Sequence, residues 1–526
     1  MALYLFFILI SQILASPGLC TSYLLIGAIV LIAFSFVISP VIIRFVSRFS
    51  LHEEQHFTKI SGKKLKILFY GLPLLVLLLY YFAYYPGGYI NDSLAQYNEY
   101  FYGQYGDWHP ALHTLLVFTL PLKLTRGWIG SVVLFQIIFF AAALGYGFET
   151  VHEYAGRNYV IGCMVYILCN PLLAISVNPW KDTSFAIGAL LLMTYSLKIV
   201  CTKGQWLKKP LNMIMFVFVF VFTTIFRHNA VLFTVPLLFA VFFYVSRKRF
   251  ICLLIAAVAL FGIIKGPLYS AVKVERNTEK RQSEMLGLPM NMIGAAVTYD
   301  PEVLDQDIQD FAYRIAPEQI WEEYYEPGNI NIIKWGTQND IDEFVNFEVV
   351  EEYGTSGVLD MSMRCLKASP LVCMRSIVKL TEGVYTVTDD HYTDMTPYIE
   401  ENYFGIGVPG IGIDNYLGLN KPSTRENVLT SFFYAVRCFV NDLCPHIFLY
   451  YGVAVLLVVI SVCSKCRFGK LKDWKTILFA VPLLAYNFGT SLLLTGYNDC
   501  PRYFYYTVLV VPVLLVFFYR KEEKSK

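Results

Sequence analysis

Apolar stretches of about 20 residues, separated by short polar loops, recur along the whole chain. A helix of about that length crosses the hydrocarbon core of a bilayer, which is about 30 Å thick. Helices also satisfy their own backbone hydrogen bonds, which no water satisfies inside a membrane. The pattern therefore predicts about twelve transmembrane helices, at roughly 2–19, 21–44, 67–86, 127–147, 158–177, 183–201, 211–226, 228–246, 250–268, 445–463, 475–495 and 502–519.

The positions of Lys and Arg orient these helices, because loops on the cytoplasmic side of a membrane carry an excess of basic residues. With twelve spans, all of the strongly basic loops fall on one side of the membrane. We predict that this side is cytoplasmic and that both termini lie there. The basic segments are 45–66, 198–210, 247–249, 464–475 and 520–526.

This orientation depends on residues 110–124, which are apolar but short and contain Pro121. We interpret them as a helix that lies along the outer interface and does not cross the bilayer. If they crossed, the later basic loops would move to the outer face, which argues against a crossing.

One long polar region interrupts the apolar pattern. Residues 269–444 are rich in Asp, Glu, Tyr and Asn and contain turn signals such as "EPGN" and "GIGVPGIGID". The region is long enough to form a small domain. The predicted organisation is a transmembrane catalytic module over 1–268 with its first outer loop at 87–126, an extracytoplasmic region of mixed structure over 269–444, and C-terminal transmembrane helices with a short cytoplasmic tail over 445–526.

The composition supports the same fold class. Hydrophobic residues make up 56% of the 526 residues and charged residues only 16%, and the mean hydropathy is +0.51. A soluble protein would carry about 25% charged residues. The chain is therefore predicted to be an all-α polytopic membrane protein of the cell membrane, for which a net charge of +2 says little about partners.

The twelve cysteines are spread singly along the chain. Cys463 and Cys466 form a CxxC pair, but no second pair or histidine completes a zinc site, so we interpret them as small apolar residues at a helix end. One or two disulfides remain open within the large polar region. The cysteines there are Cys365, Cys373, Cys438 and Cys444.

Polar residues gather at the outer ends of the predicted helices. They come from "NDSLAQYNEYFYGQYGDWHP" in the first outer loop and from "NPWKD", "RHN" and "NDCPRY" farther along the chain. Ionisable groups at this depth are costly unless they are paired or hydrated, so they indicate a polar cavity at the outer surface. The candidate residues are Asp92, Asp107, Trp108, His109, Lys181, Asp182, Arg227, His228, Asn229, Asp499 and Arg502.

The spacing of residues within the first outer loop predicts an amphipathic helix lying on the membrane. One face is apolar or aromatic and the other is polar, with the acids pointing away from lipid. The two sets are Leu94, Tyr97 and Phe101, and Asp92, Gln96 and Glu99.

Each polar residue of the first outer loop also has an ordinary structural explanation. Ser93 with Gln96 fits a capping box, and Asn91 or Asp92 would cap the same helix. His109 precedes a proline and would simply close a turn.

The basic candidates have such explanations too. Lys181 would pair with Asp182, and Arg502 with Asp499, as ordinary interfacial ion pairs. Arg227 would extend to the lipid headgroups. The sequence leaves these alternatives open, although their joint placement on one side favours a shared site.

The chemistry of the outer surface limits the reactions that such a site performs. An enzyme there has no access to cytoplasmic ATP or sugar nucleotides, whereas a sugar carried on a lipid phosphate is available. A carboxylate would deprotonate an acceptor hydroxyl in a displacement at an anomeric carbon. Lys, Arg and His would hold the leaving phosphate.

The sequence resembles membrane glycosyltransferases of the GT-C superfamily, which include protein O-mannosyltransferases and bacterial lipid A aminoarabinose transferases. The resemblance rests on "INDSLAQYNEYFYGQYGDWHPALHTLL", "NPWKDTSFAIGALLL", "RHNAVLFTVPLL" and "PRYFYYTVLVVPVLL". These stretches are similar to a poorly characterised bacterial branch of that superfamily. The resemblance spans most of the helices and is weakest over 270–440.

The resemblance implies an inverting transfer from a polyprenyl-phosphate sugar, with Asp92 as the general base. It also implies that Lys181 and Asp182 form the polar step after the fifth helix. The basic residues that it places against the lipid phosphate are Arg227, His228 and Arg502.

Some relatives use a divalent cation such as Mg²⁺ or Mn²⁺, and many have two adjacent acids or a D-x-D in the first outer loop. Here Asp92 is followed by Ser93, and the next acid is Glu99. That departure puts a metal role in doubt, unless Asp107 and His109 complete the site.

Two other functions are weighed against this one. A transporter or flippase for lipid-linked sugars would favour ionisable groups near the middle of the membrane, and Lys265 in "GIIKGP" is the best sign of one, although it more readily extends to the interface. A non-enzymatic anchor would present 269–444 to a partner. For the glycosyltransferase, the expected partners are the polyprenyl-phosphate-sugar donor, a cell-envelope acceptor and membrane lipids, with no nucleic acid.

Overall fold

The computed structural model describes residues 1–15, 21–48, 62–275, 285–334, 344–386, 427–444, 451–468, 474–497 and 500–519. Across these ranges the secondary structure is helical, apart from isolated β-bridges. The all-α fold class is therefore confirmed. Within the described part of 269–444 we find helices and bridges in place of the strands that a mixed region would contain. Asp499 and the "GIGVPGIGID" segment lie outside the described residues.

Within the described ranges, six helices are long and apolar enough to cross a membrane, and a seventh span results if one bent pair counts as a crossing. The chain is therefore a multi-pass membrane protein. Five shorter apolar helices accompany them. The main helices of this bundle are α4 (Leu72–Ala83), α8 (Gly130–Ala155), α9 (Arg157–Leu168), α10 (Lys181–Cys201), α11 (Pro210–Phe226), α12 (Val231–Phe242), α13 (Arg247–Ile263), α25 (Tyr451–Phe468), α27 (Val481–Ser491) and α29 (Tyr506–Tyr519).

An N-terminal pair of helices and several short elements precede or extend these helices. The N-terminal hairpin packs α1 against α2, and α2 also contacts α25. The elements are α1 (Ala2–Ala15), α2 (Thr21–Val46), α3 (Gly62–Lys66), η1 (Ile67–Gly71), η4 (Gln205–Lys208), η6 (Ile264–Leu268), α14 (Tyr269–Ala271), α26 (Trp474–Ile477) and η12 (Leu478–Ala480).

The predicted helix at 158–177 is broken into two pieces. Helix α9 ends at Leu168, and the short helix η3 (Pro171–Val177) continues at an angle of 68°. Pro171 cannot donate a backbone hydrogen bond to the preceding turn, so the α-helix ends before it. The Asn170 side chain accepts from the Leu172 amide at 2.9 Å and caps the new helix. The break leaves the following residues free to turn into α10.

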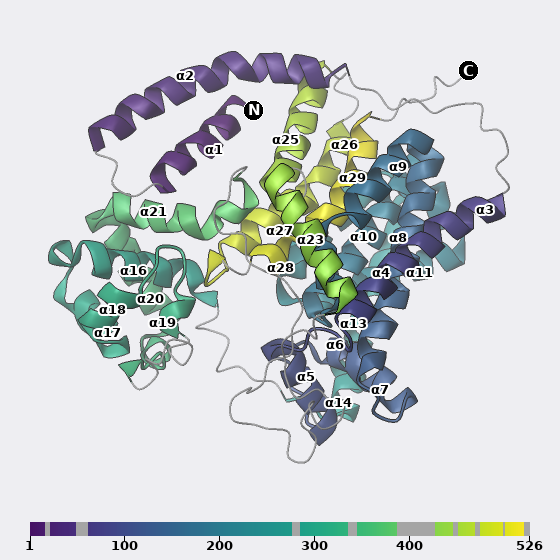
Figure 1. Cartoon of the computed structure of the whole chain (residues 1–526), viewed down its shortest axis with the longest axis horizontal. Coiled ribbons are helices and arrows are strands. Elements are labelled where there is room, and N and C mark those ends of the chain that lie inside the picture. The colour runs from purple at the N-terminus through teal and green to yellow at the C-terminus, as the bar shows by residue number, and fades with distance from the viewer. Residues whose placement is uncertain are drawn as a thin grey trace.

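Two amphipathic elements lie side by side at one end of the bundle, near the bottom of Figure 1. Helix α5 (Asn91–Tyr102) ends at Gly103, whose φ of 67° favours glycine. The predicted interfacial helix at 110–124 is present as α6 (Ala111–His113), η2 (Thr114–Thr119) and α7 (Leu120–Leu124). It is among the shorter apolar helices, below the length of a candidate span.

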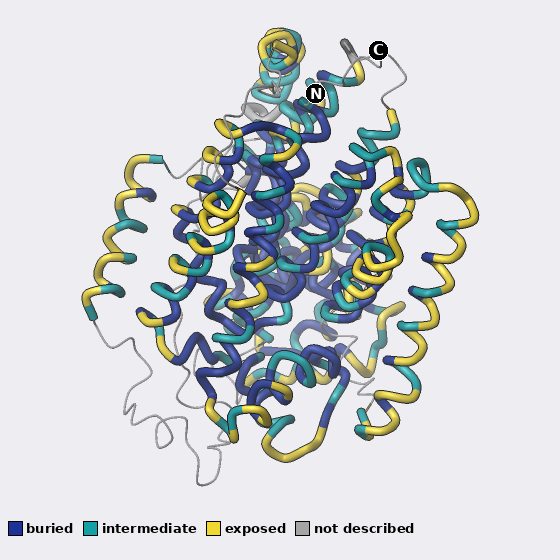
Figure 2. The backbone as a smooth tube through the Cα atoms, turned by 90° about the vertical axis from the view of Figure 1, so that its right-hand side faces the viewer, coloured by how far each residue is buried: buried dark blue, intermediate teal, exposed yellow. Residues whose placement is uncertain are grey.

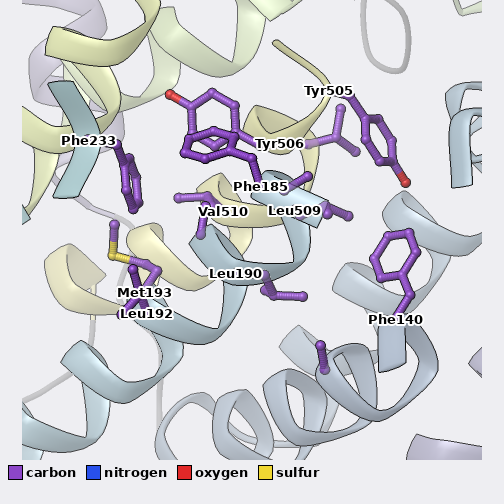
Figure 3. Close-up of a cluster of buried hydrophobic side chains, with 14 of the residues drawn as sticks. Phe140, Phe185, Leu190, Leu192, Met193, Phe233, Tyr505, Tyr506, Leu509 and Val510 are labelled. Carbon is purple, nitrogen blue, oxygen red and sulfur yellow. The ribbon is translucent and has the colours of Figure 1, made fainter. Parts of the chain in front are cut away.

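The bundle core lies between its central helices, where the backbone in Figure 2 is buried, while the peripheral helices stay exposed. Helix α10 packs closely on α29 and α11. In Figure 3 the side chains of Phe185, Phe233 and Tyr506 meet in this core. Phe185 also stacks on Tyr486, with the ring centroids 4.5 Å apart. This aromatic layer lies one helical turn after the first residues of α10.

The chain between the two halves of the bundle forms a helical unit with its own hydrophobic core, which we call the outer unit (residues 285–334 and 344–386); its last apolar residues, Leu380, Val384 and Tyr385, belong to the bundle core. Trp321, Phe311 and Ile293 are fully buried at its centre. In Figure 1 it lies to the lower left of the bundle. Its elements are α16 (Gly287–Tyr299), η7 (Pro301–Val303), α17 (Gln306–Ile315), α18 (Glu318–Tyr324), α19 (Asn331–Lys334), α20 (Val349–Ala368), α21 (Pro370–Thr381) and η10 (Glu382–Val384).

Helix α23 (Val428–Leu443) packs on the bundle. The ring of Phe433 stacks on Tyr80 of α4 at 3.9 Å, and the Asn427 amide donates to the Ala83 carbonyl at 3.0 Å. Asn427 also caps α23 through a capping box. Part of the polar region predicted from the sequence therefore belongs spatially to the transmembrane bundle.

Close approach of α10 to α11 requires a glycine at position 188. A Cβ there would collide with the Thr223 hydroxyl and lie 3.0 Å from Thr223 Cβ. We expect Gly188→Ala to lower the free energy of unfolding by about 1–3 kcal/mol, because overpacked cores must shift their neighbours. Gly162→Ala in α9 is the matched control, since a Cβ there meets nothing within 4 Å. Thermal unfolding in detergent checks the pair, and equal midpoints would contradict tight α10–α11 packing.

Candidate functional site: a cluster of ion pairs at the helix ends

Four segments that are distant in sequence bring charged residues together. Asp92 lies in the first turn of α5, and Lys181 and Asp182 open α10. Arg227 lies between α11 and the short helix η5 (His228–Ala230), and Arg502 lies in α28 (Cys500–Phe504). Both carboxylates occupy helix N-termini, where the backbone dipole favours negative charge. We call these five residues the ion-pair cluster.

Arg502 bridges the two carboxylates of the ion-pair cluster. Its Nε lies 2.6 Å from Asp182 Oδ2, and its Nη2 pairs with Asp92 Oδ2. Lys181 Nζ lies 3.4 Å from the same Asp92 oxygen. Burial on its own would raise the pKa of Asp92, but Arg502 and then Lys181 hold that pKa well below its usual value. Asp92 is therefore ionised in the folded protein.

Asp182 is the most buried member of the ion-pair cluster, with only 1% of its side chain exposed. Its second oxygen pairs with Arg227, whose side chain is 6% exposed. Arg227 Nε donates to Asn229 Oδ1 at 2.5 Å, and Asn229 Nδ2 donates to the Thr490 hydroxyl at 2.8 Å. Buried charges of this kind persist only when they are paired and hydrogen-bonded. The cluster holds three cations against two carboxylates, so one positive charge is in excess.

Aromatic rings enclose the two guanidinium groups. Arg227 lies over the Tyr503 ring at 4.0 Å from its centroid, and Arg502 lies over Trp180 at 5.2 Å. Such contacts are strongest where water is excluded. The buried Trp180 Nε1 has no hydrogen-bond partner among the described residues, and neither has the buried Ser93 hydroxyl on α5. Two unused donors therefore lie on segments that form the cluster.

The residues 108 and 109 connect the first outer loop to this cluster. His109 Nδ1 lies 3.3 Å from Lys181 Nζ, which donates to it. Burial, followed by the charge of Lys181, lowers the pKa of His109 to about 3, so its ring is neutral. The Trp108 carbonyl lies 3.4 Å from Nε2 of the exposed His228. His109, Trp108 and His228 thus lie at the border of the cluster.

Asp107 belongs to a different contact. Its two oxygens lie 3.1 and 3.0 Å from Lys265 Nζ, which also lies over the Tyr269 ring. The expectation that Lys265 extends to the interface stays a prediction; the structure adds that its ammonium group has a carboxylate partner. This pair ties the loop after α5 to the end of α13 through η6.

The residues do not fit a divalent cation. Both carboxylates of the ion-pair cluster are engaged by Lys or Arg, and Asp107 is engaged by Lys265. Among the described residues, no group of three or more His, Cys, Asp or Glu side chains is placed to hold a metal ion. Asp107 and His109 do not complete a metal site here.

Several structural alternatives for these residues are also wrong. The N-cap of α5 is Ile90, and no side chain caps the helix. Lys181 pairs with Asp92 and not with Asp182. Arg227 is buried in an ion pair and does not extend to the surface.

The four cysteines for which the sequence left disulfides open are free thiols: Cys365, Cys373, Cys438 and Cys444.

A second buried polar network was not foreseen as part of the site. Gln96 Nε2 lies 2.8 Å from His113 Nδ1 and 2.9 Å from the Thr114 hydroxyl, and that hydroxyl donates to Glu99 at 2.8 Å. His113 Nε2 lies 3.0 Å from the Ser184 hydroxyl, one turn after Lys181. The network therefore fixes the start of α10 against α5. The spacing of Asp92, Gln96 and Glu99 along one helical face was the signal that pointed to it.

Comparison with known proteins identifies a family but no activity. The family of unknown function DUF6020 matches residues 104–526. Because the match covers well over half of the chain, the chain belongs to that family. The match includes Lys181, Arg227 and Arg502 but begins after α5, which carries Asp92. No curated protein and no solved structure matches the chain.

Removing the bridge between the two carboxylates should destabilise the protein. Arg502→Ala leaves the buried Asp182 with one cation fewer, and we expect the free energy of unfolding to fall by about 3 kcal/mol. Arg364→Ala on the outer unit is the control, because Arg364 pairs with the exposed Asp305 and Asp307. Thermal unfolding in detergent should show a large loss for the first variant and little for the second. Equal losses would contradict the buried bridge.

The second network should make stability depend on pH through Glu99. Burial raises the pKa of Glu99 from 4.5 to about 7, against hydrogen bonds from Thr114 and Gly106 that lower it. The stability that this group contributes is present at acid pH and is lost as the pH rises through about 7. Glu99→Gln should remove this loss.

Unfolding midpoints of the wild type and Glu99→Gln, measured from about pH 5 to 8, check this dependence. The opposite dependence, from the lowered pKa of His109, should persist in both proteins. Parallel pH curves for the two proteins would show that Glu99 does not hold a proton in the fold.

Proposed function

We propose that this member of the DUF6020 family is an integral-membrane glycosyltransferase. It would move a sugar from a polyprenyl-phosphate donor to an acceptor of the cell envelope, on the extracytoplasmic face. The reaction would be an inverting displacement with Asp92 as the base. The observation that carries the proposal is the ion-pair cluster, which joins a carboxylate to a cation-rich site at the ends of membrane helices.

The orientation is part of this proposal. Twelve crossings would consist of the seven candidate spans, with the bent pair counted as one, four of the shorter apolar helices without Ala111–Leu124, and α27. All of the strongly basic loops would then lie in the cytoplasm with both termini, and the ion-pair cluster would face outward. An outward site has no supply of nucleotide sugars, which favours a donor carried by the membrane itself.

The cations of the cluster suit a lipid phosphodiester. Lys181, Arg227 and Arg502 exceed the carboxylates by one charge, and a phosphodiester carries one negative charge. Arginine binds phosphate through paired hydrogen bonds, and a dry, aromatic surrounding strengthens them. Trp180 Nε1, which has no partner among the described residues, would supply a further donor.

The proposed step is balanced by one proton transfer. The acceptor oxygen attacks the anomeric carbon, the bond from that carbon to the phosphate oxygen breaks, and the lipid phosphate leaves with the electron pair. Asp92 takes the proton of the acceptor hydroxyl. In an oxocarbenium-like transition state that hydroxyl becomes acidic as its bond to carbon forms, so a carboxylate is a strong enough base.

Donor binding would also change the state of Asp92. In the described structure Arg502 and Lys181 hold this carboxylate and lower its pKa. A phosphate that takes over those two cations leaves Asp92 with fewer partners, and its basicity rises. The ion pairs would then be the resting state of the site.

The catalytic role of Asp92 is tested with purified protein and a panel of radiolabelled polyprenyl-phosphate sugars, with cell-envelope extract as the source of acceptor. We expect Asp92→Asn to lower kcat by about 10²–10⁴, as removal of a general base does, while the protein stays folded in detergent. Asp305→Asn on the outer unit is the matched control and should turn over normally. Normal turnover by Asp92→Asn would remove Asp92 from the base role.

The same assay tests the phosphate site. Arg227→Ala and Arg502→Ala should raise the apparent KM for the donor by about tenfold or more, since charge-assisted hydrogen bonds are lost. Unchanged donor kinetics would exclude both residues from that site. Donor binding in the wild type without turnover, even with extract present, would favour a flippase for lipid-linked sugars.

A further inference from the structure

The loop that precedes Arg502 is hydrogen-bonded to the outer unit. Residues 494–497 belong to the connection between α27 and α28, of which residues 498–499 lie outside the described residues. The Ile330 amide donates to the Thr495 carbonyl at 2.9 Å, and Asn291 Nδ2 reaches the same carbonyl at 3.2 Å. On the other side the Tyr497 amide donates to the Gly328 carbonyl at 3.1 Å. The loop is thus hydrogen-bonded to the outer unit through its backbone.

Side chains reinforce this contact. The Tyr497 hydroxyl donates to Glu326 at 2.7 Å, and Tyr497 itself is buried. Asn291 is fully buried in α16, and its backbone carbonyl accepts from the Tyr325 and Ser376 hydroxyls at 2.7 and 3.0 Å. The residue that holds the Thr495 carbonyl is therefore itself held by the core of the outer unit.

At two glycines the outer unit and the loop are in close contact. A Cβ at Gly287, the first residue of α16, would collide with the Leu494 carbonyl and lie 2.5 Å from its carbon. A Cβ at Gly496 would collide with Asn329 and lie 2.9 Å from Asn331 Nδ2. Glycine is required at both positions because backbone meets backbone or a buried amide there.

Helix α28 is held in the same way. A Cβ at Gly383 of η10 would meet Cys500 Sγ at 2.6 Å, so the end of the outer unit, which packs in the bundle core, contacts the first residue of α28. The Pro501 carbonyl accepts from the Tyr451 hydroxyl of α25 at 2.9 Å. Figure 1 shows α28 between the outer unit and the bundle. Arg502 follows directly and bridges Asp92 and Asp182.

We propose that the outer unit positions Arg502, with Gly287 and Tyr497 as positioning residues that act on the donor site through it. The predicted effect on donor binding rests on the proposed function. The positioning of Arg502 can be tested without a substrate. A guanidinium that must meet two carboxylates, or a phosphate, tolerates displacements of only about 0.5 Å. The rigid contact with the loop supplies that accuracy from outside the bundle.

The test is a set of double-mutant cycles between Gly287→Ala and Arg502→Ala. Gly287→Ala pushes the Leu494 carbonyl away and should lower the unfolding midpoint in detergent, partly by breaking the bridge of Arg502. In the Arg502→Ala protein the same substitution should lower the midpoint clearly less, because that bridge is already absent. Gly357→Ala in α20 is the matched control, since its Cβ would make only an ordinary contact of 3.6 Å with Tyr353.

The second arm measures the donor. Gly287→Ala should raise the donor KM about tenfold in the wild-type background and less than about twofold in the Arg502→Ala background, with kcat changed much less. Tyr497→Phe, which removes only the hydroxyl bonded to Glu326, should show the same coupling on a smaller scale. Tyr497→Phe replaces Gly287→Ala in the double-mutant cycle if Gly287→Ala does not fold.

The unfolding midpoints and the donor kinetics together distinguish a failure of the positioning role from a failure of the proposed function. Additive midpoints for Gly287→Ala, or for Tyr497→Phe, with Arg502→Ala would overturn the positioning role whatever the substrate is. Coupled midpoints in a wild-type protein that neither binds nor uses polyprenyl-phosphate sugars would keep the positioning role and overturn the proposed function. Coupling in both arms would support both.

Discussion

The contact on which the site depends is the bridge that Arg502 makes between Asp92 and Asp182. Asp182 is almost fully buried, and an ionised carboxylate survives in that environment only when cations and hydrogen bonds replace water. Arg502 and Arg227 supply them from two other segments. The ends of α5, α10, α11 and α28 must therefore meet, and the aromatic core around Phe185 packs at the next turn of α10.

The bridge also lies where two independent cores meet. The bundle core holds α10, while the outer unit holds the loop before α28. Arg502 is thus positioned by a unit that contributes no residue to the ion-pair cluster. The contact between the outer unit and this loop consists of backbone hydrogen bonds and close-packed glycines.

The electrostatics of the cluster explain why it suits a reactive site better than a purely structural role. A structural cluster gains most from equal numbers of charges, whereas here one cation is in excess. A carboxylate held in ion pairs stays ionised, and it becomes more basic when an anion displaces it from its partners. The proposed transfer from a lipid phosphate uses both properties. The apolar surroundings that make the charges costly also make each of their contacts stronger.

The sequence by itself determined the helical, membrane-spanning class and most helix positions, because a bilayer admits only long apolar helices with satisfied backbones. It predicted one continuous helix at 158–177 and missed the break before Pro171, since local apolarity does not reveal a bend. It placed Asp92, Lys181, Asp182, Arg227 and Arg502 at helix ends, but it did not determine their partners. Tertiary packing decided that Lys181 pairs with Asp92, that Lys265 pairs with Asp107, and that Glu99 and His113 are buried. The reason is that an ion pair depends on which helices become neighbours, and that choice is made by contacts between residues far apart in the sequence.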